Sequence, residues 1–439
     1  MSSVFSFDVD RYIEKLKSAD PLTEFGVVDK IVGNSIESQG PNATVGSVCW
    51  LSNGERQFPV EVIGFSEGRV VTMPLGKVDG IRQGDLLRVS GRTASIGMSE
   101  SLRGRILDGM GRPIDSKPLP ADLEQQALYS DPSNPMDRDP IRDSIQTGVR
   151  SIDGLLTCGM GQRIGIFGGS GVGKSTLLGM IAKYTSADIN IIALVGERGR
   201  EVREFIENDL GESGLQRSIV FVSTSDQPAL VRIRAAFAAT AAAEYFRDRG
   251  FNVMLMMDSV TRFAMAQREV GLAAGEPPSS KGYTPSVFSL LPRLLERSGK
   301  FSKGSITAFY TVLVEGDDMN DPIADSVRSI LDGHIVLDRK LAGRGHYPCI
   351  DILNSISRLM PQLVDENVKT AAYGIRDLLA VHKDSEDLIN IGAYKRGSNP
   401  RIDRAIEKIE SIQTFLKQRA EEPSTLEAAR ASLLALNQA

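Results

Sequence analysis

The chain has little cysteine and no long apolar run, and both absences limit what it can be. Its three cysteines, Cys49, Cys158 and Cys349, are far apart in 439 residues and form no CxxC pair. They therefore predict neither a disulfide framework nor a cysteine-based zinc site. No segment approaches the roughly 18 uncharged apolar residues of a membrane span, and the N-terminus carries acids where a secretory signal needs basic and apolar residues. We therefore expect a cytoplasmic protein with reduced, buried thiols.

A surplus of positive charge is also missing. The 51 lysines and arginines are outnumbered by 56 aspartates and glutamates, which gives a net charge of −5. An acidic chain is not built as a bulk nucleic-acid binder. Hydrophobic residues make up 41% of the chain, which excludes a wholly disordered protein.

The sequence pattern changes along the chain and predicts three folded parts after a short helix. Residues 1–20 place apolar side chains at helical spacing, and this short amphipathic helix needs a partner surface. Residues 21–96 hold short β-rich runs between Gly, Asn and Pro, typical of a small barrel or sandwich. Residues 97–361 alternate apolar strands with helices, as in a doubly wound α/β domain. Residues 362–439 show only helical periodicity. The strands predicted for the α/β part are 163–167, 189–195, 218–222, 252–258, 305–313 and 334–337.

The strongest chemical signal is the segment 168–175, which reads G-x-x-x-x-G-K-S between an apolar strand and a helix. This is the pattern of a P-loop, whose glycines let the backbone wrap the phosphates of a nucleotide. Lys174 is predicted to reach the β and γ phosphates of ATP, and Ser175 to ligate Mg²⁺. The residues predicted to contact the nucleotide here are Gly168, Gly169, Ser170, Gly171, Val172, Gly173, Lys174, Ser175 and Thr176.

Two acids follow apolar strands further along the chain. Asp258 ends the run VMLMMD, and a carboxylate at such a strand end holds Mg²⁺ or its water shell. Glu197 follows the strand 189–195 and is the candidate base that orients the attacking water, although spacing alone leaves its role open. Phosphoryl transfer also needs positive charge on its transition state. Spacing does not choose among three candidates for that charge: Arg198, Arg262 and Arg358.

Longer segments resemble the ring ATPases related to the catalytic subunit of rotary ATP synthase. Within that group, 104–115 and 385–398 are similar to the ATPases of type III protein export, in the flagellar branch. The resemblance extends from about residue 22 to about residue 418. It implies an α/β fold with a P-loop RecA-like ATPase core, an N-terminal small β-barrel and a C-terminal helical domain. The segments that carry it are 196–207, 256–269, 271–299, 316–339 and 346–360.

The resemblance also implies roles for the candidate residues. Glu197 matches the catalytic carboxylate, and Arg198 and Arg262 match positions near the γ phosphate. Arg358 matches an arginine finger that one subunit offers to the nucleotide of its neighbour. Tyr347 matches an aromatic residue that stacks on adenine.

The resemblance further implies an assembly. Lys174, Glu197, Asp258 and Arg358 all lie in one chain, so a ring of identical subunits would contain every part of every site. We therefore expect a homohexamer with six competent sites at subunit interfaces. The acidic loop 317–321 matches a loop that faces the central channel, where a stalk-like export protein would touch it.

The expected function is ATP hydrolysis that drives delivery of proteins for flagellum assembly. Its expected partners are a regulator that binds the helix in 1–20, the exported proteins and their chaperones, and a membrane export gate at the cytoplasmic face of the inner membrane. A virulence type III secretion ATPase and a catalytic subunit of a rotary ATP synthase or ion pump remain alternatives, because the same catalytic parts serve all three. A nucleic-acid translocase is disfavoured, since residues 24–96 lack a set of stacking aromatics interleaved with basic residues.

Overall fold

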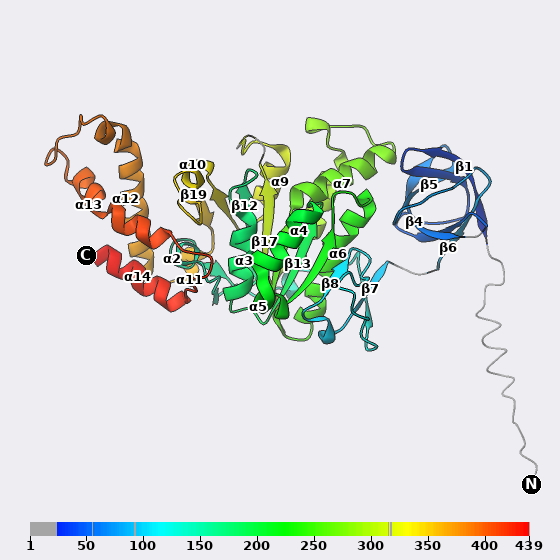
Figure 1. Cartoon of the computed structure of the whole chain (residues 1–439), viewed down its shortest axis with the longest axis horizontal. Helices are drawn as coiled ribbons and strands as arrows, with labels where there is room; N and C mark the ends of the chain where they lie inside the picture. The colour runs from blue at the N-terminus through cyan, green and yellow to red at the C-terminus, as the bar shows by residue number, and fades with distance from the viewer. Residues whose placement is uncertain (1–23, 55, 92–93, 315, 317, 439) are drawn as a thin grey trace, which may run out of the picture. The chain divides into compact units, whose positions relative to one another are not determined.

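The structure is a computed structural model, and Figure 1 shows the whole chain. It describes residues 24–438 with the exception of 55, 92–93, 315 and 317. The helix predicted in 1–20 lies outside the described residues. The chain forms two compact units: the described residues as far as Ala94 together with Ala273–Gly275, and Ser95–Leu272 together with the residues from Glu276 onward.

The first unit contains a closed β-barrel, which confirms the β-rich prediction for this part of the chain. Its antiparallel strands follow the order β1-β2-β5-β4-β3-β6, and β6 pairs with β1 to close the barrel. Buried Val, Ile and Leu side chains and Cys49 fill the interior. The sequence does not predict β2, because Ile36 is the single apolar residue in that run. The strands are β1 (Phe25–Val32), β2 (Ser35–Gln39), β3 (Val48–Ser52), β4 (Gln57–Ser66), β5 (Arg69–Pro74) and β6 (Leu86–Val89).

The second unit is built on a large, mainly parallel sheet. Its strand order is β19-β18-β12-β17-β15-β13-β14-β8, with β16 paired to β17. All neighbours from β18 to β8 are parallel, whereas β19 and β16 are antiparallel to their partners. The six apolar runs predicted as strands all lie in this sheet, so the α/β prediction is confirmed. The strands are β8 (Ile106–Asp108), β12 (Arg163–Gly168), β13 (Ile189–Val195), β14 (Ser218–Ser223), β15 (Asn252–Asp258), β16 (Gly299–Lys300), β17 (Ser305–Leu313), β18 (Gly333–Leu337) and β19 (Ile350–Ser357).

Smaller elements surround this sheet. Two short antiparallel pairs, β7 with β9 and β10 with β11, lie outside it. The sequence predicts neither edge strand of the large sheet, because glycine and proline around β8 signal turns and β19 mixes polar with apolar residues. The short elements are β7 (Ser95–Met98), β9 (Glu124–Ala127), β10 (Ser144–Ile145), β11 (Cys158–Gly159) and the 3₁₀ turns η1 (Glu100–Leu102), η2 (Pro135–Asp137) and η4 (Ser280–Gly282).

Helices pack against the sheet, and α6 shows how the sequence fits them to it. This helix is predicted at 228–249 and spans Ala229–Arg247. Its many alanines let it lie close to β13, β14 and β15, and nearly the whole helix is buried. The other helices before residue 364 are α2 (Arg150–Leu155), α3 (Lys174–Tyr184), α4 (Gly199–Glu204), the π-helical η3 (Phe205–Leu210), α5 (Gly211–Gln216), α7 (Val260–Ala273), α8 (Pro285–Leu295), α9 (Pro322–Ile330), α10 (Arg339–Gly343) and α11 (Met360–Leu363).

Three helices follow in the last part of the described chain: α12 (Glu366–Asn390), α13 (Pro400–Leu416) and α14 (Leu426–Gln438). The breaks between them fall where glycine and proline interrupt the helical pattern. Within the described part of the chain, no helix is long and apolar enough to cross a membrane.

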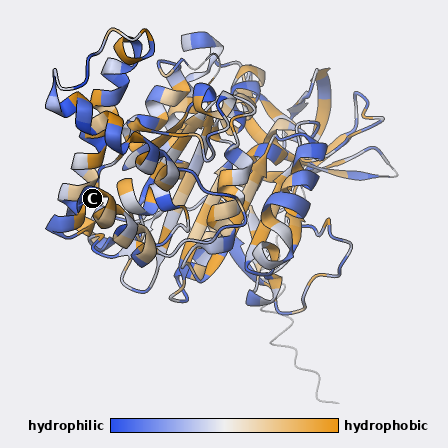
Figure 2. Cartoon of the chain, turned by 60° about the vertical axis from the view of Figure 1, so that its left-hand side comes forward, coloured by the Kyte–Doolittle hydropathy of each residue, from blue (hydrophilic) through white to orange (hydrophobic). Residues whose placement is uncertain are grey.

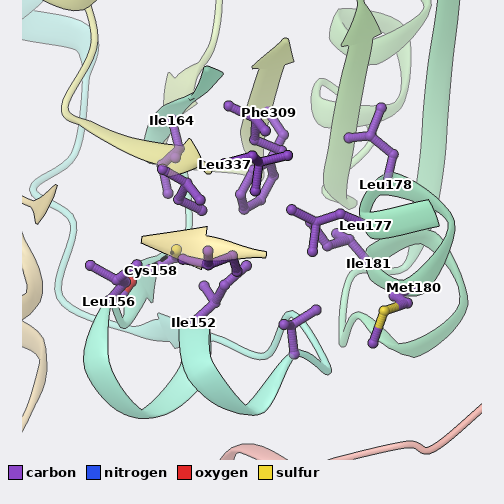
Figure 3. Packing of buried hydrophobic residues seen from close by; sticks show 14 of the residues in the cluster. Ile152, Leu156, Cys158, Ile164, Leu177, Leu178, Met180, Ile181, Phe309 and Leu337 are labelled. Carbon is purple, nitrogen blue, oxygen red and sulfur yellow. Dashed lines mark hydrogen bonds between the residues drawn. The ribbon is translucent and has the colours of Figure 1, made fainter. Parts of the chain in front are cut away.

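One hydrophobic core joins the sheet to these helices. Buried side chains from α2, β12 and β17 meet those of α3 (Figure 3), and the cluster continues into α12, α13 and α14. Hydrophobic residues are concentrated in the central strands, while the helices carry hydrophilic residues on their outer surface (Figure 2). Labelled members of the cluster in Figure 3 are Ile152, Leu156, Cys158, Ile164, Leu177, Leu178, Met180, Ile181, Phe309 and Leu337.

Candidate nucleotide-binding and catalytic site

Four neighbouring parallel strands, in the order β12-β17-β15-β13, end at one edge of the large sheet. Gly168 of β12 is in register with Leu313 of β17, and Leu194 of β13 is in register with Asp258 of β15. The P-loop, Asp258 and Glu197 therefore all lie at this edge. Ligands of open α/β sheets bind outside the carboxyl ends of the strands, so the topology alone makes this edge the candidate site.

The P-loop has the backbone geometry that its sequence predicts. Gly171 and Gly173 have φ values of +76° and +82°, which side chains with a Cβ rarely adopt. Gly173 directly precedes α3, so the free amide groups of the first helical turn face the loop. Val172 is buried under the loop, whereas Ser170 and Thr176 are exposed.

Lys174 bends over this loop. Its ammonium group donates to the carbonyl oxygen of Gly168 at 3.2 Å and also to that of Gly169. Burial lowers the pKa of Lys174, and the charges of Asp258 and Glu197 act in the opposite direction. The structure therefore holds a partly desolvated cation between the loop and the two acids.

Asp258 is buried and has one fixed partner. The residue is 6% exposed, and its Oδ1 accepts a hydrogen bond of 2.6 Å from the hydroxyl of Thr311. Burial raises the pKa of Asp258 above its ordinary value, while Thr311 and Lys174 oppose that shift. Thr311 is not among the residues predicted from the sequence. The register of β15 and β17 places it beside Asp258, because Thr311 follows the residue of β17 that pairs with Met257, and no local sequence signal gives that register.

Glu197 lies in a half-buried position two residues after the end of β13. Burial, followed by the charge of Asp258, raises its pKa to about 8, and Arg262 partly opposes the shift. The Nε of Arg262 lies 3.9 Å from Oε1 of Glu197. A carboxyl group whose pKa lies near neutral pH is suited to general acid–base work.

Gly196 makes the approach of Arg262 possible. Its φ is +73°, and a Cβ built there would lie 2.9 Å from the Cβ of Arg262. The glycine between β13 and Glu197 thus allows α7 to pack closely against the loop, which brings Arg262 to Glu197.

Arg198 is placed differently from Arg262. Its side chain is 75% exposed and pairs with Glu201, with 3.5 Å between Nη1 and Oε1. The structure thus brings Lys174, Asp258, Glu197 and Arg262 together, whereas Arg198 extends into solvent at the start of α4.

Arg358 lies toward the opposite end of the sheet from the P-loop of its own chain. Ser357, which precedes it at the end of β19, pairs with Gly333 at the start of β18. Phe167, one residue before the P-loop, is in register with Val336. Along β18, Gly333 and Val336 are three residues apart, which separates Arg358 from the P-loop by roughly 10 Å in the strand direction. Across the sheet, β19 is two strands away from β12, which adds about another 10 Å. The guanidinium therefore does not reach its own P-loop.

Tyr347 borders a cleft of about 960 Å³ beside the P-loop. Its ring is half-exposed, and a Cβ on Gly173 would lie 3.8 Å from its Cδ1. The connection between α13 and α14 forms the facing wall: the backbone amide of Gln418 donates to the carbonyl oxygen of Tyr347 at 2.9 Å. The sequence does not predict this wall, because it lies about 70 residues from Tyr347 and carries no motif. The residues of this connection that line the cleft are Lys417, Gln418, Arg419, Ala420, Glu421 and Glu422.

The acidic loop is described only in part, since residue 317 lies outside the described residues. Asp318 and Asp321 pair with Lys281, with oxygen–nitrogen distances of 3.3 and 3.4 Å. That the acidic loop 317–321 faces a central channel stays a prediction.

The converging P-loop, Asp258 and Glu197 define a P-loop nucleotide-binding protein, and comparison with known proteins identifies its family. Residues 148–357 match the family model of the ATP synthase alpha/beta family, nucleotide-binding domain, and residues 364–435 match the T3SS EscN ATPase C-terminal domain. The flagellum-specific ATP synthase of Bacillus subtilis is 56% identical over 427 residues, which cover 97% of this chain and 98% of the relative.

Two solved structures are also similar. The assembled ATPase EscN of the enteropathogenic E. coli type III secretion system has a TM-score of 0.89 and 49% identity, with coverage of 94% of this chain and 100% of EscN. EscN in complex with its central stalk EscO has a TM-score of 0.87 and 48% identity, with the same coverage. The chain therefore belongs to the ATP synthase alpha/beta family, in the branch of the flagellum-specific and type III secretion ATPases.

Proposed function

We propose that this protein is the ATPase of a flagellar type III export apparatus and that it couples ATP hydrolysis to the unfolding and delivery of export substrates. The observation that carries the proposal is the convergence of Lys174, Asp258 and Glu197 at one sheet edge, next to the cleft at Tyr347. The flagellar assignment is favoured over the virulence alternative by the relative at 56% identity. The match of residues 364–435 to a type III secretion domain favours export over a rotary synthase.

The residues at this edge divide the work of hydrolysis. The P-loop amides and Lys174 bind the phosphates of ATP, and Tyr347 stacks on the adenine across the cleft. Glu197 orients the attacking water and, in its ionised form, accepts the proton of that water; the raised pKa makes this carboxylate a stronger base than an ordinary glutamate. Arg262, 3.9 Å from Glu197, stabilises the negative charge of the transition state, and the exposed Arg198 approaches the γ phosphate only if its side chain turns from Glu201.

The donor set also fits Mg²⁺. Ser175 in the first turn of α3 and the buried carboxylate of Asp258 supply hard oxygen ligands. Mg²⁺ usually binds one or two protein groups together with substrate phosphates, and the described residues contain no cluster of three or more His, Cys, Asp or Glu that would form a protein-only site. When bound, Mg²⁺ neutralises charge on the β and γ phosphates.

The position of Arg358 supports a ring. Because it lies away from its own P-loop, a finger role requires a neighbouring copy that presents Arg358 to the nucleotide of the next subunit. We propose a homohexamer, which the assembled state of EscN supports. The complex of EscN with its stalk supports a stalk-like partner for this chain, at the loop 317–321.

The remaining partners are proposed from the family. The segment 1–20 binds a regulator, and the ring works at the cytoplasmic face of the inner membrane with the export gate, substrates and chaperones. The proposed domains are a β-barrel domain in residues 21–96, an ATPase domain in residues 97–361 and a helical domain in residues 362–439.

A complementation experiment tests the function. In a strain without the gene, the wild-type chain should restore motility and Glu197→Gln should not. Glu212→Gln is the matched control, since Glu212 is exposed on α5 and should restore motility fully. Motility with Glu197→Gln at the wild-type level would refute the proposed role of hydrolysis.

A further inference from the structure

Helix α12 is hydrogen-bonded to β19, the strand that directly precedes Arg358. Nη2 of Arg376 donates to the carbonyl oxygen of Ser355 at 3.0 Å and lies 3.5 Å from that of Leu353. These carbonyl groups lie three and five residues before Arg358 on β19. β19 is an edge strand with β18 as its one neighbour in the sheet, so its outer carbonyls need partners from elsewhere.

Arg376 does not take part in an ordinary surface ion pair. Its side chain is half-buried, and burial lowers its pKa. Among the residues that the structure describes, no carboxylate lies within ion-pair distance of it. The next residue of α12 provides a contrast, because Asp377 pairs with Arg401 at 2.8 Å with both side chains largely exposed. Such an exposed pair contributes about 1 kcal/mol or less, whereas a half-buried cation that binds backbone carbonyls fixes the strand it touches.

Arg376 and Arg358 line the same small cavity of about 180 Å³, together with Tyr373 and two leucines at the end of α2, Leu155 and Leu156. The backbone amide of Arg358 donates to the carbonyl oxygen of Asp332 at 3.0 Å. The end of β19 is thus held on one side by Asp332 and on the other by Arg376. Loss of the Arg376 contact would free the outer side of this short segment.

We propose that Arg376 is a positioning residue for the finger: it fixes the end of β19 and so sets the direction in which Arg358 is presented to the neighbouring nucleotide. This inference rests on the finger role proposed above for Arg358. Because Arg376 belongs to α12, the C-terminal helices of one subunit then control turnover at the site of the next subunit, not at their own.

The first test separates turnover from binding. Arg376→Met removes the donors and keeps much of the side-chain length. We expect kcat for ATP to fall about 10- to 100-fold, as for a misplaced catalytic group, while KM changes less than about twofold. Arg376→Lys, which keeps a cation and a donor, should recover part of kcat. Arg401→Gln is the control, since it removes the exposed ion pair at the neighbouring position of α12, and it should leave both constants unchanged. A fall in kcat for Arg401→Gln of the same size would overturn the proposal.

The second test asks in which subunit Arg376 acts. Arg376→Met and Glu197→Gln subunits are mixed 1:1 and reassembled, and ring formation is checked by size-exclusion chromatography. A working interface needs an intact Glu197 from one subunit and an intact Arg376 from the next, so random mixing completes about one interface in four. We expect activity near one quarter of wild type, well above either parent.

A parallel mixture of Arg358→Ala with Glu197→Gln separates the possible failures. If this mixture recovers activity and the Arg376→Met mixture does not, Arg376 acts within its own subunit and the inference is wrong. If neither mixture recovers activity, Arg358 is not a finger offered in trans, and the finger role fails together with the inference.

Discussion

Replacing Glu197 by glutamine should stabilise the fold while it abolishes turnover, and the gain in stability should depend on pH. Burial, with the charge of Asp258, raises the pKa of Glu197 from 4.5 to about 8. In the unfolded chain this carboxyl group loses its proton near pH 4.5, whereas in the fold it keeps the proton until about pH 8. The folded state binds more protons between these values, so Glu197 lowers the free energy of unfolding progressively as the pH rises through this window.

The magnitude follows from the same numbers. The difference between 4.5 and about 8 corresponds to about 5 kcal/mol at 1.36 kcal/mol for each pH unit. The side chain is 19% exposed, so water screens part of this cost and about 1–3 kcal/mol remains. Glutamine has nearly the same shape and carries no charge at any pH. At about 1–2 °C for each kcal/mol in a unit of more than 300 residues, Tm should rise by about 1–6 °C above pH 8 and hardly change at pH 5.

The assay is a series of thermal melts of the nucleotide-free protein between pH 5 and pH 9. Glu212→Gln removes the same charge from an exposed position and should not change Tm at any pH. Phosphate release by Glu197→Gln should fall by about 10²- to 10⁴-fold over the same range. A Tm difference that is independent of pH, or one that Glu212→Gln reproduces, would refute the argument that burial of this carboxyl group costs stability.

Three further substitutions test other parts of the site. Lys174→Ala should weaken ATP binding by at least about tenfold in equilibrium titrations, because it removes the cation that lies over the P-loop. Thr311→Val should raise the Mg²⁺ concentration for half-maximal activity about 10- to 100-fold, since Asp258 loses its 2.6 Å hydrogen bond, and unchanged Mg²⁺ dependence would exclude that role. Arg358→Ala should spare ATP binding and abolish turnover, and wild-type specific activity should rise with protein concentration through the range of ring assembly; flat activity would contradict a finger offered in trans.

The sequence indicates the P-loop and the strand-end acid Asp258 clearly, because local pattern and chemistry coincide there. Gly171 and Gly173 adopt the backbone angles that their motif requires, and Asp258 ends a buried strand that its apolar run already indicates. The strand that directly precedes Arg358, β19, is harder to predict. Its residues alternate irregularly because it is an edge strand that pairs with β18 on one side and contacts α12 on the other.

Contacts that depend on tertiary packing could not be predicted. Thr311 becomes a partner of Asp258 only through the register of β15 and β17. Gln418 reaches Tyr347 because the connection between α13 and α14 folds back to the cleft, and nothing local in the sequence signals that return. Cys349 is a similar case: it donates to the carbonyl oxygen of Val172 at 2.7 Å, beneath the P-loop, and this contact depends on the return of β19 to the sheet edge.

The C-terminal helices contact both halves of the composite site. The connection between α13 and α14 contacts the cleft at Tyr347 through Gln418, and α12 contacts β19, the strand that directly precedes Arg358, through Arg376. If Arg358 acts on the nucleotide of a neighbouring subunit, as proposed above, a displacement of these helices on ATP binding at Tyr347 would change the support of Arg358 at a different interface. In the proposed ring of identical subunits, the contacts of a single chain would then link successive sites.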